Sequence, residues 1–404
     1  MLADIPAVFI LVGLIAYTVL AGADFGVGLW TLLPAGGTGR AAIHDHSRHA
    51  MAPVWEANHV WLIFVLVVCW TAYPVAFGSI ASTLAAPLFL AAVGIILRGT
   101  SYALRGLLDQ APGRRLIEHL FALSSVLTPF ALGTVAGALA SGRVPVGNAA
   151  GNLVTSWLNP TSILIGTLAV ATSSYLAAVY LAADAHRLGE PDLERAFRSR
   201  ALWAGAVAGA LAVTGLLVVR VDAPTFWHGL TRPAGLVLVG VSAAAGLATL
   251  GLVRRRRFGP GRVCAALAVA AVVTGWAVAQ HPWFLSGLTV HQAAANRSTL
   301  LAVVIAVAVG AAVLLPSLLL LFGLLLRGRF DTGTHPASPM RRPPYAADRS
   351  SRPLGALAIA GLLVGVGLAV LADPGWLLAV GVVCLFVCAG AAFVLASTGP
   401  DHDG

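Results

Sequence analysis

Charged side chains are scarce in this sequence, and lysine is absent from it. Only 10% of the 404 residues are charged, all 25 basic residues are arginine, and 58% of the residues are hydrophobic. Soluble domains carry about 25% charged residues, so this composition excludes a soluble globular fold. With a mean hydropathy of +0.88, the chain is predicted to be an integral membrane protein. In a membrane protein, the positions of the basic residues behind the net charge of +9 indicate how the helices are oriented, rather than affinity for nucleic acid.

Cysteine is also rare, with four residues in the whole chain. Cys69, Cys264, Cys384 and Cys388 all lie in apolar runs, where a free thiol behaves as a small hydrophobic group. Cys384 and Cys388 share a helix face at a spacing of four, but packing is the simpler explanation. The cysteines therefore predict neither a disulfide framework nor a metal site.

Apolar runs long enough to cross the membrane recur along nearly the whole chain. About 20 helical residues span the roughly 30 Å of hydrocarbon. We therefore predict an all-α polytopic membrane protein with about eleven transmembrane helices, some joined by short connections such as Phe77-Gly78-Ser79. The predicted spans are 5–33, 53–78, 80–106, 115–141, 160–185, 200–219, 232–253, 262–280, 299–326, 354–372 and 375–397.

The longest polar stretch, residues 327 to 353, divides the chain. It is rich in proline, arginine and serine, which is typical of a flexible linker. The sequence therefore predicts three parts: a membrane domain of about nine helices at 1–327, a cytoplasmic linker at 328–353, and an additional transmembrane hairpin at 354–397.

Arginines are distributed unevenly over the connections between the predicted spans. If the amino terminus is outside, 21 of the 25 fall in the odd, inner connections, and only Arg143, Arg220, Arg232 and Arg297 fall in the even ones. Because cytoplasmic loops are enriched in basic residues, we predict an external amino terminus and a cytoplasmic carboxyl terminus. The first span lacks both a preceding basic segment and a following small-residue cleavage site, so we expect it to remain as a membrane helix.

Two carboxyl groups lie in apolar surroundings, Asp24 in the first span and Glu56 at the start of the second. An ionisable side chain in a membrane span costs a few kcal/mol and is by default a sign of function. The predicted orientation places both in the cytoplasmic half. His59 shares a helix face with Glu56, and Asn58 lies beside it. A carboxyl, an imidazole and an amide are groups from which a proton relay is built.

An anchoring role for Glu56 is the alternative. Its carboxylate could pair with an arginine of the adjoining inner connection, such as Arg98 or Arg48, and fix the helix in the membrane. The residues alone leave relay and anchor equally open.

Other features of the first two spans have simpler interpretations. Gly22 and Gly26 are four apart, which gives a face of small residues where another helix can approach. Trp55 and Trp61 are interpreted as interface and packing residues. His59 and His119 are the one plausible pair of haem ligands, and we expect no haem in this chain.

Several motifs together resemble one family, subunit II of the cytochrome bd-type quinol oxidases. The likeness covers residues 1 to about 327, and its second motif is the most specific. Segments WLNPTSILIG and LTVHQAAANRSTL resemble those before the family's fifth and ninth helices. In LAGADFGVGLW the shared positions are Gly22, Asp24, Gly26 and Gly28, and in APVWEANHVWLI they are Pro53, Trp55, Asn58, Val60, Trp61 and Leu62.

The sequence departs from the family pattern at several acidic positions. Ala21 stands where the family's first motif has aspartate, and Glu56-Ala57 replaces an aspartate-glycine pair. After Arg98, Ala103 occupies a position where the family often has a further acid. A proton route that followed the family pattern would therefore lack one relay point.

The resemblance implies a fold, a function and a partner. It implies nine helices, arranged as two four-helix bundles plus one, in a haem-free subunit of a quinol oxidase. Its heterodimer partner, subunit I, would carry haems b and d, the quinol site and the oxygen-reducing centre. Glu56, Asp24, Asn58 and His59 would line a path for cytoplasmic protons.

We accordingly expect a subunit of the bacterial inner membrane that contacts lipid and quinone. The added hairpin is expected at the periphery, where a small accessory subunit would otherwise bind. A secondary transporter and a purely structural scaffold are the rival interpretations. Against the transporter, the acids lie toward one membrane face, and the two halves show no matching helices broken by glycine or proline.

Overall fold

The computed structural model describes residues 2–32, 43, 46, 55–104 and 111–326, with seven further residues between 360 and 387. Contacts divide the chain into two units, Met1–Leu320 and Leu321–Gly404, and the account below concerns the first. The predicted linker at 328–353 and most of the predicted hairpin lie outside the described residues. The three-part division of the chain therefore stays a prediction.

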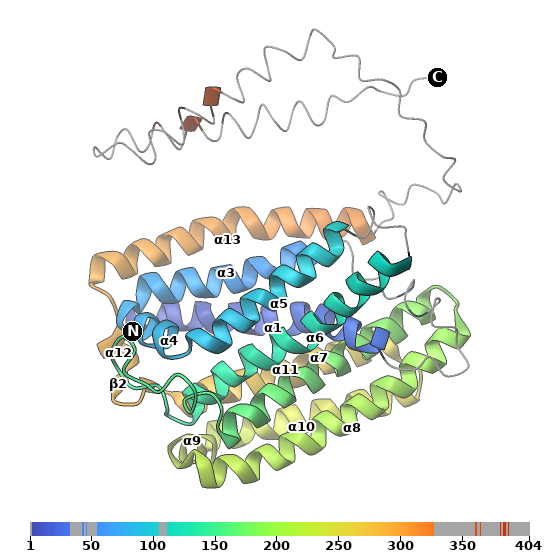
Figure 1. Cartoon of the computed structure of the whole chain (residues 1–404), viewed down its shortest axis with the longest axis horizontal. Helices are drawn as coiled ribbons and strands as arrows, with labels where there is room; N and C mark the ends of the chain where they lie inside the picture. The colour runs from blue at the N-terminus through green and yellow to red at the C-terminus, as the bar shows by residue number, and fades with distance from the viewer. Residues whose placement is uncertain are drawn as a thin grey trace. The chain divides into compact units, whose positions relative to one another are not determined.

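The first unit is built almost entirely of helices (Figure 1). Eight of the described helices are long and apolar enough to span a membrane, and α3 contains a shorter apolar stretch, Asn58–Ala72. The prediction of an all-α polytopic membrane fold is confirmed. The long helices are α1 (Ile5–Leu32), α3 (Trp55–Ala72), α5 (Ala85–Leu104), α6 (Ala111–Ala140), α7 (Pro160–Arg187), α8 (Pro191–Asp222), α10 (Pro233–Arg254), α11 (Phe258–Gln280) and α13 (Arg297–Leu326).

The predicted boundary between the second and third spans is wrong. Phe77-Gly78-Ser79 lies inside a short helix, α4 (Pro74–Thr83), and the breaks fall at Tyr73 and Leu84. Proline cannot donate the backbone hydrogen bond that would continue α3, and it disfavours helical geometry in the residue before it. Tyr73 instead has φ −136° and ψ 61°, and its buried hydroxyl donates a hydrogen bond to the carbonyl of Ala3.

Prolines begin several helices and left-handed residues end them. α7 starts at Pro160, where the Asn159 side chain accepts a hydrogen bond from the Ser162 amide, as expected of a helix cap. It ends at Arg187, and Gly189 follows the capping residue Leu188 with a φ of +71°, which suits the residue after a helix cap. The corresponding residue after α10 is Arg256, with φ +57°.

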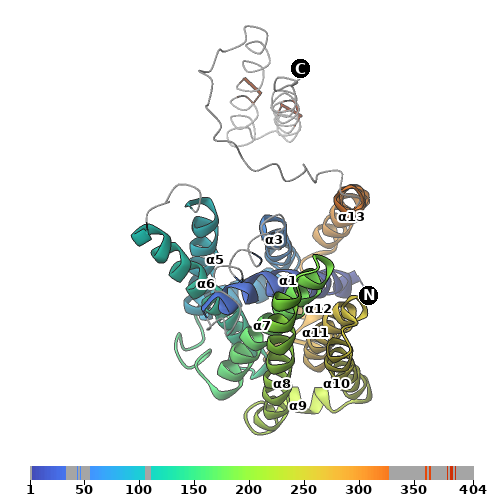
Figure 2. The ribbon, with the colours of Figure 1, turned by 90° about the vertical axis from the view of Figure 1, so that its right-hand side faces the viewer.

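Helices α1 and α7 lie at the centre of the packing. α1 contacts α3, α6, α7 and α11, and α7 contacts α6 and α8 as well. Figure 2 shows α7 among α1, α6, α8 and α11. The largest buried cluster accordingly follows α7 from Tyr175 to Ala185. The arrangement as two four-helix bundles plus one helix stays a prediction.

Short elements close one end of the unit. Helices α9 (Pro224–Leu230) and α12 (Val290–Ala293) lie there with η1 (Leu2–Asp4) and a hairpin of β1 (Trp283–Leu285) and β2 (Leu288–Thr289). Ser286 in the hairpin donates a hydrogen bond to the Gly142 carbonyl at 2.9 Å. Buried charges lie deeper, between α1, α5 and α6.

Candidate functional site in the buried charge cluster

An ion pair between Asp24 of α1 and Arg98 of α5 forms the centre of the site. Both side chains are 0% exposed. Arg98 Nε donates to Asp24 Oδ2, and Nη2 donates to Oδ1, each at 2.8 Å. Nη2 also donates to the backbone carbonyl of Asp24. This two-point geometry is the strongest that arginine and a carboxylate form, and it joins two helices far apart in sequence.

Polar and aromatic groups complete the surroundings of the ion pair. Arg98 Nη1 donates to Ser125 Oγ at 3.0 Å, and the Tyr102 hydroxyl donates to Asp24 Oδ1 at 3.1 Å. The guanidinium carbon lies 4.7 Å from the ring centre of Phe25 and 4.4 Å from that of Phe121. Ring faces attract a cation, so these contacts offset part of the cost of removing the charge from water.

Glycines let α1 approach its neighbours closely enough to form this site. A Cβ on Gly26 would lie 1.9 Å from the backbone carbonyl oxygen of Ser173 in α7, and one on Gly28 would lie 1.9 Å from Ser125 Oγ in α6. A Cβ on Gly22 would meet the Ser173 hydroxyl at 3.5 Å, an ordinary contact. The close approach expected from the glycine pair therefore depends on Gly26.

Helix α3 brings a second group of polar side chains to α1. The His59 imidazole lies 6.2 Å from the ring of Tyr17 and 5.9 Å from that of Phe25, measured between ring centres. Asn58 is buried, and its Nδ2 lies 3.4 Å from the Leu20 carbonyl. Phe25 thus touches both the guanidinium of Arg98 and the imidazole of His59, which links the two polar groups along α1.

The structure places the predicted site residues as follows. The helix α1 carries Asp24 and the glycines, and α3 brings Asn58 and His59 against it. Trp61 packs against the buried group of Tyr17, Ala21 and Phe25. Glu56 and Trp55 lie in the first turn of α3, but their side chains are outside what the structure describes.

The prediction for Arg98 is corrected by the structure. The charge pattern placed Arg98 in an inner connection, and Arg98 was one of the suggested partners of Glu56. It instead lies inside α5, and its partner is Asp24. Tyr102 and Ser125 were not singled out from the sequence. Tyr102 could have been found, because it lies one helical turn after Arg98 and therefore on the same face.

His59 and His119, the one pair that the sequence offered as haem ligands, lie in different surroundings. His119 is exposed on α6, whereas His59 lies against the aromatic rings of α1. Two axial ligands must face one another across the iron. Within the described ranges there is also no group of three or more metal-ligating side chains.

A second ion pair lies at one end of the helices. Arg143 donates two hydrogen bonds to Asp222, at 2.7 and 2.9 Å, and the Thr161 hydroxyl donates to the same carboxylate at 2.6 Å. The hydrogen bond with Asp222 raises the pKa of Arg143 above its ordinary value. This pair is partly exposed and joins the ends of α6, α7 and α8, which indicates a structural role.

These features define a class, the polytopic helical membrane proteins that pair charges inside the helix bundle. The family model described as cytochrome bd terminal oxidase subunit II matches residues 2–325. The chain therefore belongs to that family, which confirms the resemblance seen in its motifs.

Individual relatives are distant. The chain is 22% identical over 216 residues to a putative cytochrome bd menaquinol oxidase subunit II of Bacillus subtilis (strain 168), covering 53% of this chain and 61% of the relative. It is 27% identical over 171 residues to cytochrome bd ubiquinol oxidase subunit 2 of the same organism, covering 40% and 48%. The chain thus matches between about half and three-fifths of these relatives' lengths.

A solved structure shares the fold. A chain of the bd oxidase from Geobacillus thermodenitrificans is similar with a TM-score of 0.68 and 24% identity, covering 80% of this chain and 98% of that one.

Proposed function

We propose that this chain is the haem-free subunit of a quinol:oxygen oxidoreductase in a bacterial inner membrane. In this proposal it stabilises a haem-bearing subunit I as a heterodimer and lines a path for cytoplasmic protons. The observation that carries the proposal is the family match over residues 2–325. The arginine asymmetry supports an external amino terminus and a cytoplasmic carboxyl terminus.

The chemistry of such an enzyme requires a proton path. Oxidation of two quinols yields two quinones, four electrons and four protons, and reduction of one O₂ to two waters consumes four electrons and four protons. If quinol releases its protons outside and the consumed protons come from the cytoplasm, each turnover conserves energy across the membrane. The haems b and d of the partner would supply the electron transfer and oxygen chemistry.

Glu56 is the residue we propose to receive protons at the cytoplasmic side. Its position in the first turn of α3 precedes His59 by one helical turn, and His59 lies against α1 beside Tyr17. Asn58 and His59 would order water between Glu56 and the buried part of α1. A carboxyl followed by an imidazole provides two groups that can bind and release a proton in turn.

Asp24 has a different role within this proposal. Both of its carboxylate oxygens accept hydrogen bonds from Arg98, so a proton arriving there would have to displace the guanidinium. We propose that Asp24 chiefly fixes α1 against α5, with its charge neutralised by Arg98. The same ion pair also supports the scaffold interpretation, in which the chain has no role in proton transfer. Substitution of Glu56 separates the scaffold interpretation from a proton path.

The test is Glu56→Gln, with Glu190→Gln as the matched control. Glu190 is exposed and does not cap α8 through its side chain, so its substitution removes a carboxyl of the same kind away from the path. Since general acid–base groups contribute about 10²- to 10⁴-fold, we expect Glu56→Gln to lower quinol-driven oxygen uptake at least about tenfold with haem content unchanged. Glu190→Gln should retain full activity.

Two results would count against the proposal in different ways. Loss of assembled complex in Glu56→Gln, with the surviving complex fully active, would establish the anchor role. Purification of the chain without any haem-bearing partner would remove the oxidase proposal altogether.

A further inference from the structure

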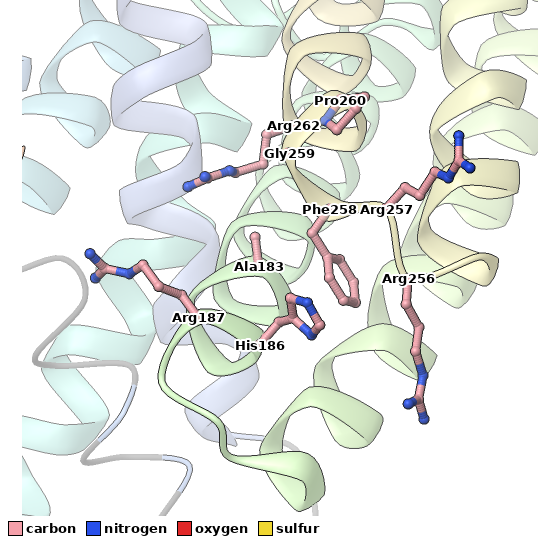
Figure 3. A pocket seen from close by; sticks show the side chains of 9 residues that line it. All are labelled: Ala183, His186, Arg187, Arg256, Arg257, Phe258, Gly259, Pro260 and Arg262. Atoms are coloured by element: carbon pink, nitrogen blue, oxygen red, sulfur yellow. The ribbon is translucent and has the colours of Figure 1, made fainter.

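Exposed arginines line a surface cavity where α7 ends and α11 begins (Figure 3). The guanidinium groups of Arg257 and Arg262 point away from each other and from the centre of the cavity. These charges therefore do not converge on one ligand. Polar groups with closer surroundings lie inside the helix bundle, where α3 packs on α1.

Tyr17 of α1 carries a buried hydroxyl that belongs to neither ion pair. The residue is 7% exposed, and its hydroxyl oxygen has no hydrogen-bond partner among the described residues. Burying a hydroxyl without a partner is costly, and most buried polar groups in proteins have one. Phenylalanine would fill the same space without this cost, so packing alone does not account for the hydroxyl.

The His59 imidazole lies against α1 at the level of Ala21. Its ring centre is 6.2 Å from that of Tyr17 and 5.9 Å from that of Phe25, and these two residues stand one helical turn before and after Ala21. Ala21 is fully buried, and its single methyl group leaves room for an imidazole from α3. The histidine thus lies at the level where the family's first motif has an aspartate.

Glu56, His59 and Tyr17 follow one another in depth from the cytoplasm. Glu56 lies in the first turn of α3, which the predicted orientation places at the cytoplasmic side, and His59 is one turn further in. Tyr17 is one turn of α1 beyond the level of Ala21, roughly 6 Å deeper. Helical side chains lean toward the N-terminus of their helix, so the Tyr17 side chain leans further from the cytoplasm.

Apolar side chains enclose this part of the interface between α1 and α3. Three helices contribute residues that pack against Tyr17, Ala21 and Phe25, namely Trp61 and Leu62 of α3, Ile95 of α5 and Leu132 of α6. Such an enclosure excludes bulk water, so a proton that moves through it has to pass between fixed polar groups. A phenol is neutral at physiological pH and avoids the desolvation cost that a carboxylate would carry there.

We propose that the Tyr17 hydroxyl is the relay group that follows His59 on the proton path, an inference that rests on the proposed function. A protonated imidazole gives its proton to the hydroxyl oxygen, directly or through one water, as the hydroxyl passes its own proton to water on the side of the haem-bearing partner. One O–H bond forms as the other breaks. The phenol and the neutral imidazole are restored, and rotation of the hydroxyl prepares the next transfer.

The test compares Tyr17→Phe with Tyr175→Phe in the full-length protein with its partner. Each variant removes one buried hydroxyl and keeps the ring, and Tyr175 lies in α7 within a different buried cluster. General acid–base groups contribute about 10²- to 10⁴-fold, and water can take over part of a relay. We therefore expect Tyr17→Phe to lower quinol-driven oxygen uptake roughly tenfold, with haem content and thermal unfolding unchanged, and Tyr175→Phe to retain full activity.

Two further measurements separate a relay from a structural role. Proton transfer limits the rate when a relay group is missing, so the solvent deuterium isotope effect on oxygen uptake should rise in Tyr17→Phe and stay unchanged in Tyr175→Phe. Groups that act as a unit give non-additive losses. The double variant His59→Gln with Tyr17→Phe should therefore be no slower than the slower of its single variants.

The outcomes distinguish this inference from the proposed function. Full activity of Tyr17→Phe beside an impaired Glu56→Gln would overturn the role of Tyr17 and leave the proton path standing. Full activity of both variants would remove the path and this inference with it. Multiplied losses in the double variant, or equal losses in Tyr17→Phe and Tyr175→Phe, would also overturn the role of Tyr17.

Discussion

Removing one member of the Asp24–Arg98 pair should lower the stability of the fold more than removing both. Asp24→Leu leaves a guanidinium without its carboxylate at a position with 0% exposure, and Arg98→Met leaves the carboxylate without its guanidinium. Breaking a buried pair from one side costs about 3–5 kcal/mol. Each single variant should therefore lower the folded-to-unfolded ratio by roughly two to four orders of magnitude.

The double variant Asp24→Leu with Arg98→Met should recover much of this loss. Neither charge remains, and the residual cost comes from Ser125 and Tyr102, each of which loses one hydrogen bond to the pair, while Ser125 Oγ still donates to the Phe121 carbonyl. Losing one hydrogen bond costs about 0.5–1.5 kcal/mol. We therefore expect the double variant to be more stable than either single one, with a coupling free energy of at least about 3 kcal/mol.

The assay is the fraction of correctly assembled complex that survives heating, together with its yield from membranes. The partly exposed pair Arg143–Asp222 provides a comparison, since exposed pairs contribute about 1 kcal/mol or less. Additive losses in the double variant, or single variants as stable as the unmodified protein, would refute the reasoning. Oxygen uptake by the double variant then shows whether Asp24 has any role beyond holding α1 and α5 together.

Two further predictions concern helix packing and the end of the chain. Gly26→Ala should lower the stability of the folded chain by about 1–3 kcal/mol or more, because its Cβ would collide with the Ser173 backbone. Gly22→Ala should be tolerated. Equal yields of assembled complex for the two variants would contradict this prediction. Truncation after Arg327 should leave assembly and turnover unchanged if the predicted hairpin at 354–397 is peripheral. A truncated chain that fails to assemble with its partner would show that the added segment is required.

Hydrophobic patterning predicted the helices well because each long apolar run must cross the bilayer as a helix. The predicted run 160–185 begins where α7 begins, and the run 262–280 ends where α11 ends; the opposite ends differ from the helices by two and four residues. The break at Tyr73 was missed because the following residues stay apolar through α4, so hydropathy alone does not register Pro74.

The site was predicted only in part, because side-chain pairing depends on packing. Asp24 could be singled out by its isolation in an apolar run. Its partner lies 74 residues away, and nothing local to Arg98 distinguishes an arginine that faces α1 from one at a helix end.

The distance between Asp24 and Arg98 along the chain also matters during synthesis. A ribosome making about 5–20 residues per second needs roughly 4 to 15 s to add the intervening 74 residues. Throughout that interval the first helix holds an acidic side chain in the translocon or at its lipid boundary before Arg98 has been made. Arrival of α5 supplies Arg98, so a nascent chain stalled before this point keeps a carboxylate in the membrane without the partner that it has in the folded protein.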